Sequence, residues 1–259
     1  MNPNISEFSY GYAVTEDLIR WLGHPAAAPF FPTLAAEGML GFDVKLTAPG
    51  MPLFLQFKLS HRMVRNSVVE ISRYRLFPPN TNFYRFHLRP RRRSDQHELL
   101  IRLEAAGNEV RYAAPAFHQP DELNRAYLAR QVRNRSVFVR PSMLGPLPDD
   151  GNHHVAFIPG GPAYQLTEPR SLDGDIGFPS FAQEITDAGR DLGSQTLATR
   201  IESIVEGMMT ILREQPIVSQ QLALQSQALE RVRQDMEAVT FAAYLSRAFF
   251  DCQLLLIGT

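Results

Sequence analysis

The sequence lacks the features of several classes of protein. It contains one cysteine, Cys252, in 259 residues, which excludes an internal disulfide framework and a cysteine-rich zinc site. A reducing, intracellular setting fits this composition. The first residues hold neither the basic nor the apolar segment of a signal peptide, and no apolar run approaches the length of about 20 residues that a membrane-spanning helix needs. We therefore expect a cytoplasmic protein without a membrane segment.

The chain has almost no net charge, −1 at neutral pH, but its charges are unevenly distributed. Residues 57–145 carry 17 Lys and Arg against 7 Asp and Glu. Residues 1–56 carry 2 basic and 5 acidic residues, and residues 146–259 carry 7 and 15. A basic middle between acidic ends is typical of a protein that binds a polyanion, although a solvated arginine-rich surface has the same composition.

The periodicity of apolar residues predicts a mixed fold of helices and strands. Residues 82–90 alternate as a strand does, and residues 94–107 repeat at helical spacing. Such elements alternate to about residue 165, which predicts an α/β or α+β domain over residues 1–165. Further along, apolar residues recur at helical spacing on both sides of Pro216. We therefore expect a helical C-terminal region over residues 180–259, built as a helical hairpin.

The stretch GFDVKLTAPGMPLFLQFKLS, residues 41–60, reads as two apolar strands around a Pro-Gly turn. With the turn at residues 48–51, Asp43 lies directly across from Gln56. Side chains alternate between the two faces of a strand, so Asp43, Gln56 and Lys58 share the polar face of this hairpin. Burying such groups without partners is costly, which favours a chemical role for them.

These three residue types suit metal-assisted hydrolysis of a phosphodiester. Mg²⁺ takes oxygen ligands, here the Asp43 carboxylate and the Gln56 carbonyl, and keeps several waters. The ion stabilises charge on the phosphate and makes a bound water easier to deprotonate. Lys58 orients that water or offsets charge in the transition state. The hairpin therefore predicts a site for Mg²⁺ or Mn²⁺.

This segment resembles the PD-(D/E)XK superfamily of restriction-endonuclease-like nucleases. The similarity is greatest to the variants in which Gln replaces the second acid, such as the Mrr-like restriction endonucleases. It assigns Asp43 as the first acid and Gln56 and Lys58 as the acid-x-Lys element. The proline that gives the superfamily its name is replaced by Phe42. The resemblance covers about residues 10–120.

In this family a preceding helix often contributes a further carboxylate. Glu16 is the matching residue, and Glu37 is its competitor. The resemblance implies a mixed sheet flanked by helices, and the activity of a Mg²⁺-dependent endonuclease that hydrolyses phosphodiester bonds in DNA. The stretches SEFSYGYAVTEDL and LFLQFKLS also resemble nuclease-like proteins of bacterial defence against phage, which implies such a setting. Catalytic residues are then Asp43, Gln56, Lys58 and Glu16, of which Lys58 is not a metal ligand.

A second group of residues is a candidate for nucleic-acid binding. The run RPRRR at residues 89–93 follows a predicted strand rich in aromatic residues, and such a pattern contacts phosphate and stacks bases. A solvated loop has the same composition. We predict that DNA is contacted by Arg62, Arg89, Arg91, Arg92 and Arg93.

Besides a nuclease, two other interpretations remain open from the sequence. In the first, the chain is a nuclease-like fold without catalytic activity that binds nucleic acid or serves as a scaffold subunit. In the second, it is an unrelated α/β protein in which Asp43 and Lys58 form only an ion pair. The apolar run at residues 251–259 and the amphipathic C-terminal helices predict a homodimer or a partner protein on that surface.

Overall fold

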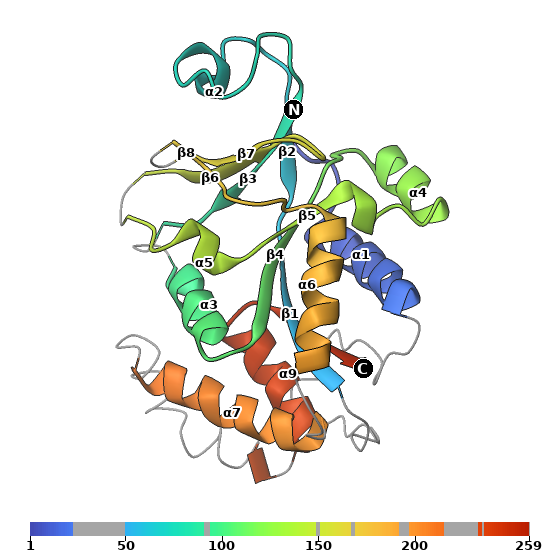
Figure 1. The fold of residues 1–259 in the computed structure, drawn as a ribbon, viewed down its shortest axis with the longest axis vertical. Helices are drawn as coiled ribbons and strands as arrows, with labels where there is room; N and C mark the ends of the chain where they lie inside the picture. The colour runs from blue at the N-terminus through green and yellow to red at the C-terminus, as the bar shows by residue number, and fades with distance from the viewer. Residues whose placement is uncertain are drawn as a thin grey trace. The chain divides into compact units, whose positions relative to one another are not determined.

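The computed structural model describes residues 1–22, 50–90, 94–148, 151–166, 169–191, 197–214, 233–234 and 236–258. Its fold is mixed α/β with two sheets flanked by helices, which confirms the predicted fold class (Figure 1). The helices are α1 (Glu7–Leu22), α2 (Val69–Ser72), α3 (Gln96–Ala105), α4 (Pro120–Leu128), η2 (Arg133–Arg135), α5 (Pro141–Leu144), α6 (Phe178–Asp191), α7 (Leu197–Glu214) and α9 (Ala238–Ala248). The strands are β1 (Gly50–Phe57), β2 (Ser60–Met63), β3 (Phe83–Leu88), β4 (Glu109–Pro115), β5 (Ser136–Val139), β6 (His153–Phe157), β7 (Ala163–Gln165), β8 (Arg170–Ser171) and β9 (Gln253–Gly258).

The chain forms two compact units, and each unit is assembled from three separate segments. The first unit consists of Met1–Trp21, Phe57–His97 and Arg111–Ile185. The second consists of Leu22–Gln56, Glu98–Val110 and Thr186–Thr259. The domains predicted from the sequence, residues 1–165 and residues 180–259, stay a prediction. In the described part of the chain, every helix is too short or too polar to cross a bilayer.

A five-stranded sheet lies in the first unit, with the strand order β2-β3-β6-β7-β8. All of its neighbouring strands are antiparallel. His61 pairs with Arg85, and His87 pairs with His154. Residues that pair directly across antiparallel strands lie on the same face of a sheet, so the register fixes which side chains can meet.

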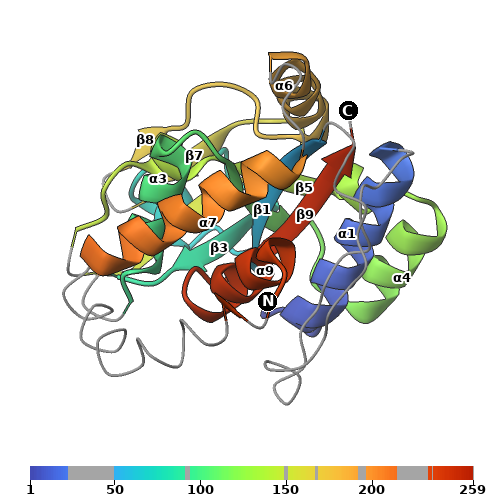
Figure 2. The same cartoon turned by 90° about the horizontal axis from the view of Figure 1, so that it is seen from below.

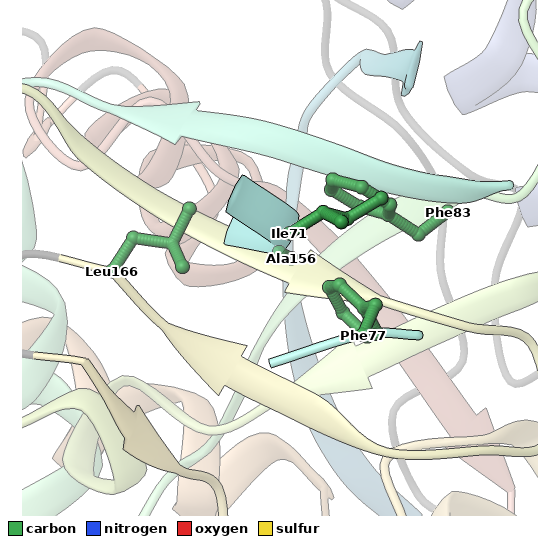
Figure 3. Packing of buried hydrophobic residues seen from close by; sticks show 5 residues of the cluster. All are labelled: Ile71, Phe77, Phe83, Ala156 and Leu166. Carbon is green, nitrogen blue, oxygen red and sulfur yellow. The ribbon is translucent and has the colours of Figure 1, made fainter. Parts of the chain in front are cut away.

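An apolar cluster covers part of one face of this sheet (Figure 3). The ring of Phe77 stacks on that of Phe83, with 4.4 Å between their centroids. Burial of apolar surface of this kind is the main stabilising contribution to a fold. The cluster holds α2 and the loop after it against the sheet, and its buried members are Ile71, Phe77, Phe83, Ala156 and Leu166.

Tyr10 fixes α1 within the first unit. Its hydroxyl donates to Oγ of Ser136 at 2.9 Å, and that Oγ donates to the carbonyl of Val132 at 2.7 Å. The ring makes edge-to-face contacts with Phe57 and Phe117. Burial raises the pKa of the Tyr10 phenol well above its usual value. The hydroxyl is therefore satisfied as a neutral donor, as a buried phenol requires.

The second sheet has the strand order β5-β4-β1-β9. Strand β1 lies between β4 and β9, and beyond its end the amide of Lys58 donates to the carbonyl of Ala113 at 2.9 Å. The predicted hairpin, in which β1 pairs with residues 42–47, stays a prediction. An apolar strand pattern fixes which face is buried, but it does not name the neighbouring strand. Residues 42–47 themselves lie outside the described ranges.

In the second unit, β9 pairs antiparallel with β1, from Gly50 opposite Gly258 to Leu55 opposite Gln253. Helix α9 precedes β9 and lies beside α7 (Figure 2). The prediction that the apolar run at residues 251–259 forms an exposed surface is wrong, because residues 252–257 are buried. A homodimer or a partner protein on the C-terminal helices stays a prediction.

Gly11 of α1 provides a test of the packing in the first unit. A Cβ at this position would lie 2.6 Å from Cδ2 and 2.7 Å from Cε2 of Phe57. Alanine favours a helix over glycine by about 1 kcal/mol, whereas overpacking costs about 1–3 kcal/mol. We expect Gly11→Ala to lower the free energy of unfolding by about 1 kcal/mol in urea denaturation.

Gly207 of α7 is the matched control, because a Cβ there would meet no heavy atom within 4 Å. Gly207→Ala is expected to raise the free energy of unfolding by about 0.5–1 kcal/mol. A Gly11→Ala protein that gains as much stability as the control would contradict the close contact with Phe57.

Candidate functional site

Part of the predicted site lies outside the described residues. The residues concerned are Asp43, Glu37, Arg91, Arg92 and Arg93. Their predicted roles stay predictions. The predicted site residues whose surroundings are described are Gln56, Lys58, Glu16, Arg62 and Arg89.

Gln56 is the penultimate residue of β1 and is almost completely buried, with 2% of its surface exposed. Its Nε2 donates to Oδ2 of Asp251 at 3.2 Å. Its Oε1 is buried and has no hydrogen-bond partner in the described part of the chain. A buried amide oxygen without a partner costs free energy. This atom is therefore an acceptor whose capacity the described fold does not use.

Asp251 brings a carboxylate to Gln56 from a distant part of the sequence. It lies between α9 and β9 with a left-handed φ of 49°, a conformation that Asp tolerates better than most residues. Its Oδ1 accepts a hydrogen bond from Nη1 of Arg247 at 3.0 Å. Asp251 was not among the predicted site residues, because it begins the apolar run DCQLLLIGT. The signal was an acidic residue directly before a strand-like segment.

The Gln56 amide and the Asp251 carboxylate are side chains of the kind that binds a hard cation. Nε2 of Gln56 faces Oδ2 of Asp251 at 3.2 Å, and Oε1 is the atom without a described partner. Amide and carboxylate oxygens are ligands that Mg²⁺ and Mn²⁺ accept. The two side chains thus bring two oxygen ligand types close together.

These two ligands do not complete a metal site. Among the described ranges, no three His, Cys, Asp or Glu side chains lie close enough together to hold a metal ion. Mg²⁺ commonly retains several waters and needs only one or two carboxylates. A cation at Gln56 therefore requires waters, substrate oxygens or a carboxylate from the residues that are not described.

Glu16, the predicted additional carboxylate, is held by its neighbours in the first unit. One carboxylate oxygen accepts from the Tyr127 hydroxyl and the other from Arg20. The hydrogen bond to Glu16 raises the pKa of Tyr127 to about 12. The described contacts of Glu16 thus join α1 to α4, and its role as a metal ligand stays a prediction.

Lys58 directly follows β1 and lies over an aromatic ring. Its Nζ is 5.8 Å from the ring centroid of Tyr112, within the range of a cation–π interaction. The Tyr112 hydroxyl is 2.8 Å from Nδ1 of His97, whose Nε2 is 2.7 Å from the carbonyl of Gly145. A carbonyl can only accept, so Nε2 donates to it, and in the neutral ring Nδ1 accepts from Tyr112. This chain of bonds fixes the ring on which Lys58 lies.

The two described arginines of the predicted nucleic-acid interface lie in the first unit. Arg89 is exposed just after β3, whereas Arg62 is partly buried on β2. Arg62 pairs with Tyr84, and its backbone exchanges hydrogen bonds with Met1. Both arginines are accessible to some degree, and DNA binding by them stays a prediction.

Comparison with protein-family models, with curated proteins and with solved structures found no match to this chain. The interpretation of the site therefore depends on the chemistry of its residues.

Gln56→Glu tests the local environment of Gln56. Burial and the neighbouring Asp251 disfavour a charged group there, so the pKa of the introduced carboxyl is expected to rise. When the pKa of an acid is raised in the folded state, the free energy of unfolding falls as the pH increases through that pKa. We expect the variant to be about 1–3 kcal/mol less stable than wild type near neutral pH, with a smaller deficit near pH 4.5. Urea denaturation at both pH values measures this difference.

Gln165→Glu is the matched control, because Gln165 is also buried and its Oε1 also lacks a partner among the described residues. Mg²⁺ is expected to restore stability to Gln56→Glu and not to Gln165→Glu, since only the first carboxyl adjoins Asp251. Equal rescue of both variants, or of neither, would contradict a cation-binding environment at Gln56.

Proposed function

We propose that the protein is a metal-dependent nuclease that hydrolyses phosphodiester bonds in DNA, with Mg²⁺ or Mn²⁺ as its cofactor. The observation that supports this most directly is the buried, unpartnered Oε1 of Gln56 beside the carboxylate of Asp251. In this proposal Asp251 supplies the negative charge that Gln56 lacks in place of an acid. Asp43 is the further carboxylate, and Glu16 is the candidate from α1.

The cation, when bound, stabilises negative charge on the phosphate and makes a bound water easier to deprotonate. Asp43, Asp251 and Gln56 hold it through oxygen atoms. Lys58 orients the attacking water or offsets charge on the phosphate. Lys58 and Lys45 are the only lysines of the chain, and the other 24 basic residues are arginines. Because an ammonium is a compact charge with rotatable donors, a lysine at position 58 supports a chemical role.

The charge distribution supports nucleic acid as the substrate. The excess of basic residues between residues 57 and 145 favours contact with a polyanion. Arg62 and Arg89 together with Arg91, Arg92 and Arg93 are the proposed contacts with DNA. A role in bacterial defence against phage is also part of this proposal, and it is supported only by the resemblance.

A second candidate function is supported by the contacts of Glu16. Its carboxylate is engaged by Tyr127 and Arg20, and Gln56 carries no charge. In this second candidate function, the protein binds nucleic acid or serves as a scaffold subunit and does not cleave its ligand. The two functions differ in divalent-metal binding, which only the enzyme requires.

Cleavage of supercoiled plasmid in Mg²⁺ or Mn²⁺ tests the proposed activity. We expect wild type to nick or degrade the plasmid, and Asp43→Ala and Lys58→Ala to lose at least about a hundredfold in rate, as for the loss of a group that stabilises transition-state charge. Asp187→Ala is the matched control, because Asp187 is exposed on α6 and forms an ion pair with Arg190 of the same helix. It is expected to cleave at the wild-type rate.

A measurement of Mn²⁺ binding separates the two functions. Binding is detected as the loss of the electron-paramagnetic-resonance signal of free Mn²⁺. Wild type is expected to bind Mn²⁺, and Asp251→Asn to bind it at least about tenfold more weakly, as for the loss of a charged ligand. Normal cleavage by Asp43→Ala would overturn the site. Absence of both Mn²⁺ binding and cleavage in wild type would favour the scaffold function.

A further inference from the structure

A group of histidines lies on one face of the five-stranded sheet. His61 on β2 pairs with Arg85 on β3, and His87, two residues further along β3, pairs with His154 on β6. Residues two apart on a strand point to the same side, so the four side chains share a face. The rings of His87 and His154 are 5.2 Å apart. We call these four residues the histidine face.

The histidine face lies on the same side of the sheet as the apolar cluster of Figure 3. Phe83 precedes Arg85 by two residues on β3, and Ala156 pairs with Arg85 across the sheet. Both belong to the buried cluster. The four side chains of the histidine face are instead partly exposed. The cluster reaches the histidine face at Leu166, whose amide donates to the carbonyl of His154 at 3.0 Å, and the four side chains keep partial exposure beside it.

Arg85 joins the two parts through an ion pair. Its Nη1 lies 2.7 Å from Oε1 of Glu70, a completely buried carboxylate on α2. On the next strands of the same side, Tyr164 pairs with Ala156 and Ser171 pairs with Tyr164, and neither is an acidic or basic residue. Glu70 is therefore the carboxylate in contact with Arg85, and it lies on the covered side.

Arg85 places positive charge on the histidine face, and the Glu70 carboxylate offsets part of it. The pKa of His154 is lowered to about 4, first by burial and then by the charges of Arg85, His87 and His61. The pKa of His61 is lowered by burial, by Arg85 and by the N-terminal ammonium. A positive potential that opposes protonation of an imidazole also opposes a bound metal cation, and it attracts a phosphate.

We propose that the histidine face binds phosphate groups of a nucleic-acid backbone. Arg85 provides a permanent charge and guanidinium donors, which form strong hydrogen bonds to phosphate oxygens. His61, His87 and His154 provide ring N–H donors beside it. The choice of nucleic acid as the source of the phosphate rests on the proposed function. The phosphate site itself does not depend on cleavage.

Binding of phosphate at this face is linked to uptake of protons. An anion beside His154 favours the imidazolium, so the pKa of His154 rises when the anion binds. A ligand that raises a pKa binds more tightly as the pH falls through that range. Contacts made by arginine alone lack this dependence near neutral pH, because arginine stays charged. Tighter binding at lower pH therefore distinguishes the histidine face from arginine contacts elsewhere.

Fluorescence anisotropy with a labelled DNA duplex tests the proposal, in EDTA so that no cleavage occurs. At constant salt, the affinity of wild type is expected to rise at least about threefold between about pH 7.5 and about pH 6.0. The double variant His87→Asn/His154→Asn is expected to bind more weakly and to lose most of that rise. His154→Asn alone serves if the double variant does not fold, as judged by thermal unfolding.

Arg125→Gln is the matched control, since Arg125 is an exposed charge on α4 of the same unit and is expected to retain the pH dependence. Nuclear magnetic resonance of the His154 ring gives an independent readout, in which DNA is expected to raise its pKa in wild type. The proposal is overturned if the histidine variants keep the wild-type affinity and pH dependence. If inorganic phosphate raises the pKa of His154 and DNA does not, nucleic acid is overturned as the ligand. Neither result depends on whether the protein cleaves DNA.

Discussion

A buried polar side chain must find its hydrogen bonds inside the protein, and so must the backbone of a strand with neighbours on both edges. Gln56 is in this position, because β1 lies between β4 and β9 and the residue is buried. Asp251 satisfies its amide nitrogen, and the amide oxygen is left without a described partner. The pairing of β9 with β1 is what brings Asp251 to this position. The proposed chemistry at Gln56 thus depends on a backbone contact between distant segments.

The elements predicted with success are those that local patterns specify. The strand predicted at residues 82–90 and the helix predicted at residues 94–107 contain β3 and α3, because apolar periodicity and end signals are local properties. Strand pairing is not local. The apolar run that forms β9 has no feature that identifies β1 as its partner, so the sequence predicted an exposed terminus instead of a buried strand. Asp251 was missed for the same reason.

The arginine-rich middle of the chain also needs to be interpreted through its contacts. Several of its arginines are engaged by carboxylates within the first unit. Arg111, with 1% of its surface exposed, contacts Glu184, and Arg133 contacts the buried Asp17. Such pairs are structural, because a buried arginine without a partner is strongly destabilising. Composition therefore overestimates the positive charge available to a ligand, and the accessible cationic surface has to be located residue by residue.

The register of β9 also has a consequence for folding. Residues paired between β1 and β9 are roughly 200 apart in the sequence, and contacts of such high separation slow folding because loop closure precedes any gain from pairing. Until β9 arrives, one edge of β1 has unpaired backbone groups next to apolar side chains, a surface prone to pair with other chains. We expect capture of β9 to limit the rate at which the second unit folds, and chaperones that shield open strand edges to act at this step.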